Sequence, residues 1–274
     1  MIDTHVHVWQ LGRNGCRWPT AAELRLYRDF DLDEFWETAL PLGMTAAILV
    51  QSQESAADTE WLLGLAEQED RVAAVIGWSD LAAPGASRRI QALALHRKLA
   101  GMRPMVQDRP ADWYDDPDLA PGLAALADAD LCLEALVRER HLPALARLAA
   151  RLPIRIVVDH AAKPRIDEAD GFAAWRAAIA PLADQRHVAV KLSGLLSECG
   201  SAGADAIPPY VEALIALFGT DRIIWGSDWP VLNAVSTYAG WQALARQLVP
   251  ACAQAAVFGG NAGRIYRLTA EMLA

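Results

Sequence analysis

The chain has 274 residues and a formal net charge of −9, and 53% of its residues are apolar. The length is that of a single α/β barrel, about 250 residues, and the apolar content excludes a disordered chain. The negative charge provides no long-range attraction for nucleic acid or an anionic membrane surface. We therefore expect neither as a partner, and a small molecule as the substrate.

Short apolar runs alternate with longer amphipathic stretches from one end of the chain to the other. Eight of these short runs are predicted strands: Ile2–Val8, Ala46–Val50, Val72–Trp78, Gly101–Met105, Leu131–Val137, Arg155–Asp159, Val188–Ser193 and Ile223–Gly226. Eight strands that alternate with helices suit a closed parallel barrel better than a doubly wound sheet, whose GxGxxG turn is missing here. We predict one (β/α)8 TIM barrel over residues 1–274.

The stretches between the strands carry apolar residues at three- and four-residue spacing, which is typical of helices packed on a sheet. The clearest are Asp58–Glu69, Ala86–Leu99, Leu142–Ala150, Gly171–Ala183 and Tyr210–Phe218. The connections contain Pro and Gly but no long polar linker, so we expect no domain boundary. Residues 10–30 form an unusually long connection, and we expect them to fold over the barrel mouth as a lid.

The first predicted strand carries two histidines, His5 and His7. Side chains two apart lie on the same face of a strand, so both imidazoles would point into the barrel. There they offer nitrogen ligands to a divalent metal, near the rim where active sites of this fold lie. The alternative is that one imidazole caps a backbone carbonyl and the other is a packed core histidine.

Tryptophans are frequent in this chain, and several lie at or just past predicted strand ends. Trp78 and Trp229 are the two that we expect to contact substrate, because aromatic faces at a barrel rim suit the C–H faces of sugars. The alternative is that these side chains serve the core through the area that they bury.

Two cations fall on strand positions that could face the cavity, Arg103 on the fourth strand and Lys191 on the seventh. Either would hold a carboxylate or polarise an ester, and Glu134 on the fifth strand could neutralise one of them. The alternative for each is a solvated or salt-bridged residue at a strand end. Pro104 directly after Arg103 removes a backbone donor, which puts a regular strand at this point in question.

The sixth and eighth strands end in polar side chains that would meet the two histidines at the rim. His160 follows the sixth strand and would bind a metal or polarise a carbonyl, whereas Asp159 is expected on the opposite face, in a structural role or orienting a histidine. Asp228 follows the eighth strand, which neighbours the first in a closed barrel. Its carboxylate would act as a general base or a metal ligand; the alternative is a helix N-cap.

The chain resembles the amidohydrolase superfamily, in its amidohydrolase-related lactonase group, which includes sugar-acid lactonases and 2-pyrone-4,6-dicarboxylate lactonases. The motifs that carry the resemblance occur in the family's order: His5–His7, Asp159–Pro164, Lys191–Leu195 and Gly226–Pro230. The resemblance implies hydrolysis of a cyclic ester. It makes Asp228 the base that activates water, places His5, His7 and His160 around the carbonyl, and places Arg103 on the substrate.

The resemblance leaves open whether the enzyme requires a metal ion. His5, His7 and Asp228 would form the ligand set for one zinc ion, but some family members retain these histidines and work without a metal. The binuclear branch carries a carboxylated lysine or a glutamate on strand four, where this chain offers Arg103. We therefore expect no two-metal site.

The function that we predict is the opening of a lactone ring, most simply a sugar-acid lactone such as L-fuconolactone or L-rhamnonolactone, to the hydroxy acid. Asp228 would take a proton from the attacking water while the imidazoles, a cation or a metal stabilise the oxyanion. One alternative is a metal-dependent decarboxylase of an aromatic acid. A second is a barrel that binds a sugar acid without turning it over.

The cysteines indicate the compartment. Cys16, Cys132, Cys199 and Cys252 lie far apart and lack the CxxC spacing of a structural zinc site, so we expect unpaired thiols in a reducing environment. The first residues lack the pattern of a signal peptide, and no apolar run approaches the roughly 20 residues of a membrane span. A cytoplasmic location is expected; a homo-oligomer is compatible with the sequence.

Overall fold

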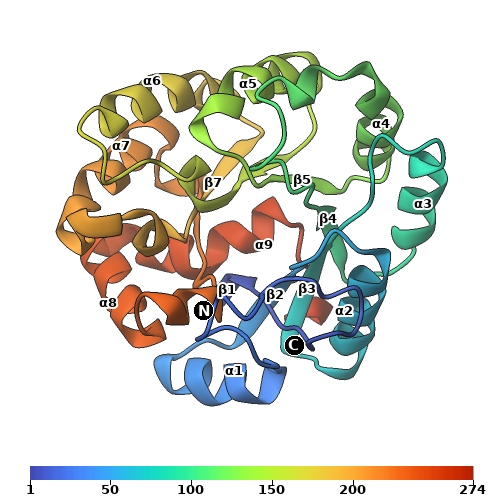
Figure 1. The fold of residues 1–274 in the computed structure, drawn as a ribbon, viewed down its shortest axis with the longest axis horizontal. Coiled ribbons are helices and arrows are strands. Elements are labelled where there is room, and N and C mark those ends of the chain that lie inside the picture. The colour runs from blue at the N-terminus through green and yellow to red at the C-terminus, as the bar shows by residue number, and fades with distance from the viewer. Residues whose placement is uncertain (274) are drawn as a thin grey trace.

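The computed structural model describes residues 1–273, in which a ring of parallel strands is surrounded by helices (Figure 1). The strands are β1 (Ile2–Val6), β2 (Ala46–Val50), β3 (Val72–Gly77), β4 (Leu99–Met102), β5 (Cys132–Ala135), β6 (Ile156–Val158), β7 (Val188–Leu192) and β8 (Ile223–Trp225). Each strand pairs in parallel with the next along the chain. The predicted (β/α)8 barrel is confirmed, with most strands shorter than expected.

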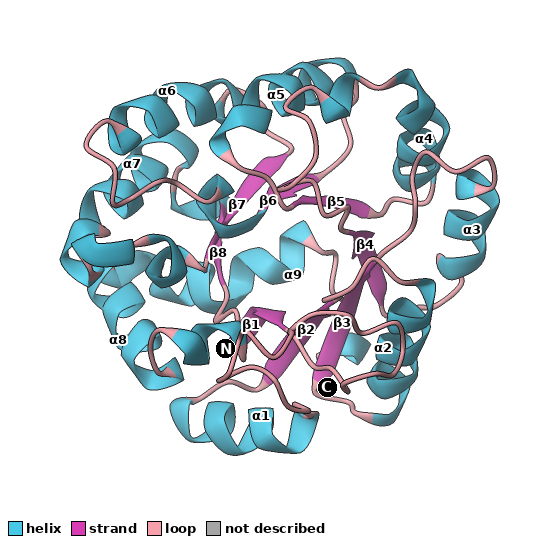
Figure 2. Cartoon of the chain, in the orientation of Figure 1, coloured by secondary structure: helices cyan, strands magenta, loops and turns pink. Residues whose placement is uncertain are grey.

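The helices follow the strands in turn, as the cyan ring of Figure 2 shows. They are α1 (Leu32–Ala39), α2 (Ala56–Gln68), α3 (Ala86–Leu93), α4 (Ala120–Asp128), α5 (Leu142–Arg151), α6 (Gly171–Ala183), α7 (Pro208–Phe218), α8 (Tyr238–Leu248) and α9 (Asn261–Ile265). The helix predicted over Ala86–Leu99 is too long: it ends at Leu93, and Leu99 already belongs to β4. None of the helices in the described residues is both long enough and apolar enough to cross a membrane.

The barrel closes where β1 meets the segment that follows β8. Val6 and Trp229 form a parallel bridge. The backbone N–H of His7 donates to the carbonyl of Trp229 at 2.8 Å, and the N–H of Asp228 donates to the carbonyl of His5 at 2.9 Å. Backbone hydrogen bonds between the first and last strands thus bring Asp228 beside the two histidines across more than 200 positions of sequence.

Small and β-branched side chains fill the lower part of the barrel, and α9 closes that end (Figure 2). Ala262, Ile265 and Tyr266 pack against interior residues of the strands, such as Ile2 and Ile224. A larger apolar layer between the strands and the outer helices forms the rest of the core. The interior is therefore filled by side chains at the end that α9 closes, and the free space lies at the opposite end, where the strands lead into their loops.

Residues 10–30 are folded mainly as turns and return to their starting point, because Trp9 and Phe30 bond each other's backbone at 3.1 Å. In Figure 1 this dark blue segment passes over the ends of β2 and β3. Its residue Trp18 lines the same cavity as His7 and Asp228. The segment therefore borders the cavity; that it serves as a lid over the mouth stays a prediction.

Candidate active site

An irregularity in β1 aims both of its histidines at the barrel interior. The pairing of β1 with β2 shifts register between Asp3 and Val6, so Ile2 and His5 both face inward although three positions separate them. His7 follows two residues later on the same face. Both imidazoles are buried, with 0% and 4% of their residues' surface exposed for His5 and His7.

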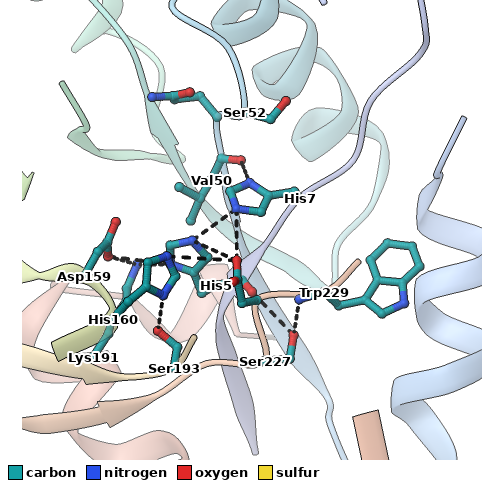
Figure 3. Close-up of polar contacts among 12 residues, drawn as sticks. His5, His7, Val50, Ser52, Asp159, His160, Lys191, Ser193, Ser227 and Trp229 are labelled. Atoms are coloured by element: carbon teal, nitrogen blue, oxygen red, sulfur yellow. Dashed lines mark hydrogen bonds and ion pairs between the residues drawn. The ribbon is translucent and has the colours of Figure 1, made fainter. Parts of the chain in front are cut away.

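The tautomer of His7 follows from its neighbours. Its Nδ1 lies 2.7 Å from the carbonyl oxygen of Val50 (Figure 3). A carbonyl can only accept a hydrogen bond, so Nδ1 carries the proton and the Nε2 lone pair is free in the neutral ring. His7 therefore caps a backbone carbonyl, as the alternative had it, and still presents Nε2 to the site; its role as a metal ligand stays a prediction.

Asp228 leaves β8 with a positive φ of 62°, and this turn directs its carboxylate at the imidazoles. Its Oδ1 lies 3.4 Å from Nε2 of His7, 3.7 Å from Nε2 of His5 and 4.0 Å from Nε2 of His160. The short helical turn that follows has Pro230 at its N-cap and no side-chain cap. Asp228 is thus placed with the three histidines, and the N-cap alternative is wrong.

His160 lies in a run of left-handed backbone. The φ angles of His160, Ala161, Ala162 and Lys163 are 50°, 50°, 64° and 50°, a conformation that costs L-residues energy and recurs at functional sites. Ser193 Oγ lies 2.9 Å from Nδ1 of the ring (Figure 3). Ser193, which follows β7, therefore positions the imidazole of His160, which follows β6.

The prediction that Asp159 points away from His160 is wrong. β6 ends at Val158, and strand alternation no longer applies once the backbone turns left-handed. Asp159 is fully buried, with Oδ1 3.5 Å from Nδ1 of His5 and Oδ2 accepting from Nη1 of Arg103 at 3.3 Å. The other part of the expectation, that it orients a neighbouring histidine, agrees with this contact.

Lys191 lies below the histidines, inside the barrel. Its ammonium donates to Glu134 at 2.6 Å, and it lies 3.3 Å from Oδ1 of Asp159 and 3.1 Å from Nδ1 of His5. Glu134 neutralises it, as expected, and Tyr266 donates to the same carboxylate. Because Lys191 is 0% exposed, the substrate contact that we expected for it is not compatible with its position.

Arg103 does reach the cavity. Its guanidinium is 3% exposed, donates to the carbonyl of Gln51, and has Nη1 3.3 Å from Nε2 of His5. β4 ends at Met102, and pairing with the β5 segment returns only at an isolated bridge between Met105 and Leu136, because Pro104 has no backbone N–H to donate. The proline thus interrupts the regular strand, and Arg103 nevertheless faces the cavity.

The two tryptophans expected to contact substrate lie elsewhere. Trp229 is 1% exposed and packs against Phe30 and Phe35, with ring centroids 5.4 and 5.5 Å away. Figure 3 shows its indole turned away from the histidines. Trp78 is half-buried at the end of β3 and is not among the residues that line the cavity. Trp229 is therefore a core residue, as the alternative had it, and neither tryptophan lines the cavity.

The cluster opens onto a cavity of about 330 Å³. Four of the predicted residues line it: His7, Arg103, His160 and Asp228. The sequence reasoning missed the others, which come from loops: Trp18, Ser52, Met105, Gln107, Asp108, Leu136, Lys163 and Val231. The sequence indicated two of these residues indirectly: Trp18 lies in the segment predicted to cover the mouth, and Lys163 belongs to the Asp159–Pro164 motif.

Comparison with known proteins now identifies the family, because the model of the amidohydrolase family matches residues 2–268. The chain belongs to the amidohydrolases. The L-fucono-1,5-lactonase of Burkholderia ambifaria is 42% identical to this amidohydrolase, over 97% of this chain and 95% of the lactonase. An amidohydrolase of Burkholderia multivorans, crystallised with bound zinc, is 35% identical, with a TM-score of 0.91 over 98% of this chain and 99% of that one.

A more distant likeness concerns the decarboxylase alternative. The 5-carboxyvanillate decarboxylase of Sphingomonas paucimobilis has a TM-score of 0.67 and 17% identity over 98% of this chain and 99% of that one. At this identity the likeness shows the shared barrel alone. It says nothing of the reaction that this amidohydrolase catalyses.

The ligand set predicted for a metal fits one zinc ion. Nε2 of His5, Nε2 of His7 and Oδ1 of Asp228 are separated by 3.1, 3.7 and 3.4 Å. Tetrahedral zinc with bonds of about 2.0–2.1 Å requires donor separations of about 3.3–3.4 Å. Since the Nε2 lone pair of His7 faces Nε2 of His5 at 3.1 Å, either a shared proton or a cation must lie between them.

Burial and charge set the protonation states of the site. Burial lowers the pKa of His160 to about 4 and also lowers that of His7; burial together with the Lys191 ammonium holds the pKa of His5 well below its usual value. Burial opposes ionisation of Asp228, but the imidazoles around it, His160 foremost, keep its pKa below the ordinary range. At neutral pH the cluster consists of neutral imidazoles around one ionised carboxylate.

Proposed function

We propose that this amidohydrolase hydrolyses a sugar-acid 1,5-lactone, L-fucono-1,5-lactone being the first candidate, to the open hydroxy acid. The observation that carries the proposal is an ionised carboxylate, Asp228, within 4.0 Å of three imidazoles at the floor of an open cavity. The 42% identity to a named L-fucono-1,5-lactonase supports the same reaction.

In the proposed reaction Asp228 accepts a proton from the water that attacks the lactone carbonyl. A carboxylate with a depressed pKa is a weak base, so the water itself must be made more acidic. Zinc bound by His5, His7 and Asp228 would lower the pKa of water and polarise the carbonyl. The chain contributes the fixed positions of these three groups, which backbone hydrogen bonds between β1 and the β8 loop hold together.

The developing oxyanion needs a donor or a positive charge near the carbonyl. His160 and Arg103 both line the cavity and supply these groups in our proposal. Ser193 fixes the His160 ring, and Asp159 together with the Gln51 carbonyl fixes the Arg103 guanidinium. Contacts with other protein groups therefore fix both side chains before a substrate binds.

The charges around the cavity favour a neutral lactone over a dicarboxylated one. Arg103 already faces Asp159, and Lys163 donates to Glu198 at 3.1 Å. Asp108 adds a negative charge to the cavity wall. A doubly charged substrate would meet this carboxylate, whereas the hydroxyl groups of a sugar lactone can donate to it.

Two other arginines, Arg109 and Arg165, are paired with carboxylates of the protein and are not free to receive a second carboxylate of a substrate. Arg109 donates to Glu54, and Arg165 donates to Glu168 and Glu139.

The four cysteines are unpaired, which supports a cytoplasmic enzyme in our proposal.

The test is a pH-indicator assay with a panel of sugar-acid lactones and one pyrone dicarboxylate, run with and without a chelator. We expect acid release from L-fucono-1,5-lactone or a closely related sugar lactone, and loss of the rate on chelation. Release of carbon dioxide from an aromatic acid, with no acid release from any lactone, would replace the proposal by the decarboxylase alternative. Binding of a sugar acid without turnover of any lactone would favour the binding barrel.

A further inference from the structure

Trp18 occupies the position in the cavity that the sequence reasoning gave to other tryptophans. It is half-buried and lines the cavity together with His7, His160 and Asp228. It also lines a neighbouring hollow of about 550 Å³, which shares part of the same wall. Within residues 1–273, Trp18 is the tryptophan that these two spaces have in common.

Gln53 holds this tryptophan by its backbone. Oε1 of Gln53 accepts from the N–H groups of Arg17 and Trp18 at 2.9 and 3.3 Å, and Nε2 donates to the Trp18 carbonyl at 2.6 Å. Gln53 is itself 5% exposed and follows β2 in the chain. The Trp18 indole lies beside that of Trp9, with ring centroids 5.5 Å apart and the ring planes at 63°. The backbone of Trp18 is therefore fixed to the barrel, and its indole packs against Trp9, before any ligand arrives.

Gln107 provides a polar group in the walls of the same two spaces. Its Oε1 is shielded from solvent and has no hydrogen-bond partner among residues 1–273. A buried amide oxygen without a donor is costly, and a ligand hydroxyl would satisfy the amide in either of its two orientations.

We propose that Trp18 and Gln107 form the sugar-binding subsite of this enzyme, which takes a lactone ring with an apolar C–H face and at least one free hydroxyl. The C–H face lies on the indole, and the hydroxyl bonds to the Gln107 amide. Cavities that bind small molecules combine aromatic walls with a few placed polar groups in this way. The inference rests on the proposed lactonase function and extends it from the reaction to the choice of substrate.

Trp18 is tested by two substitutions and one matched control. Trp18→Leu keeps an apolar side chain against Trp9 but removes the aromatic face; we expect KM for L-fucono-1,5-lactone to rise about tenfold, with kcat changed less than about threefold. Trp18→Phe should restore KM to within about threefold of the wild type. Trp61→Ala removes another half-buried tryptophan, which lines a separate hollow, and should leave KM unchanged.

Gln107 is tested by the difference between two lactones. Gln107→Leu should lower kcat/KM for L-fucono-1,5-lactone about tenfold but leave kcat/KM for δ-valerolactone, which has no hydroxyl, within about twofold. The Gln107 side chain makes no hydrogen bond within residues 1–273, so the substitution removes no internal contact of that kind.

The outcomes separate the subsite from the reaction. A wild-type enzyme that hydrolyses no sugar lactone overturns the proposed function and the inference with it. An active enzyme whose Trp18→Leu variant keeps its KM, or loses kcat alone, overturns the subsite and leaves the lactonase standing. Equal losses on both lactones in Gln107→Leu would show a merely structural role and would also overturn the subsite.

Discussion

Gly194 gives the most direct test of how the loop after β7 positions His160. It has a φ of 66°, and a Cβ added there would lie 2.5 Å from Nδ1 of His160 and 2.7 Å from Cγ. Ordinary van der Waals contact begins at 3.4 Å, so the buried ring must move by about 0.9 Å to make room. The backbone of an alanine would also be strained at this φ, by about 1–2 kcal/mol.

We therefore expect Gly194→Ala to remain folded but to lose activity. A displacement of about 1 Å at a catalytic group can lower the rate about 100-fold, so kcat for lactone hydrolysis should fall by about 10- to 100-fold. The free energy of unfolding, measured by urea denaturation, should fall by about 1–3 kcal/mol.

The matched control is Gly64→Ala. Gly64 lies within α2, and nothing lies within 4 Å of a Cβ added there. Alanine in a helix interior is favoured over glycine by about 0.5–1 kcal/mol, so this variant should be more stable with unchanged kcat. Wild-type kcat in Gly194→Ala would refute the reasoning, because the ring position would then not matter to the reaction.

Three further predictions follow from charges at the site. Asp228→Asn should lower kcat about 10²- to 10⁴-fold with an unchanged circular dichroism spectrum; wild-type turnover would remove Asp228 from its assigned role. In the metal-free protein the pKa of His160, lowered by burial to about 4, lies below its unfolded value, so the neutral ring contributes stability above about pH 6.5 that is lost as the pH falls towards 4. The unfolding free energy should decrease over this range, and His160→Asn should make the decrease shallower by about 1.4 kcal/mol per pH unit; identical slopes would contradict the burial of a neutral ring. Lys191→Met leaves the buried Glu134 without its cation and should cost about 3–5 kcal/mol of stability, whereas adding Glu134→Gln should recover part of that loss; urea denaturation of both variants measures the difference, and a loss below about 1 kcal/mol in the single variant would contradict the buried pair.

The fold could be predicted from the sequence because each strand is a short apolar run bounded by turn residues, and a buried parallel strand needs little else. Val188–Leu192 and Ala46–Val50 are examples, since both are buried at every position. The residues at which the strands end were harder to predict. β4 stops at Met102 rather than Met105, because Pro104 has no backbone N–H to donate and the pairing returns only at the isolated bridge between Met105 and Leu136.

The chemistry of the site could be predicted where it depended on strand order. Closure of the barrel places Asp228 beside His5 and His7 whatever the loops do. The position of Asp159 could not be derived, because the backbone becomes left-handed at His160 and no residue in that run is a glycine that would signal it. Trp18 could not be chosen over Trp229 for a similar reason, since the path of a loop decides which indole faces the cavity.

The central claim is that Asp228 and its imidazoles open a sugar lactone. The most direct measurement compares the wild type with Asp228→Asn in acid release from L-fucono-1,5-lactone, over the background rate of the lactone in buffer. The account predicts rapid release by the wild type and a rate near background for the variant. Equal rates for the two proteins, or no release above background by the wild type, would contradict it.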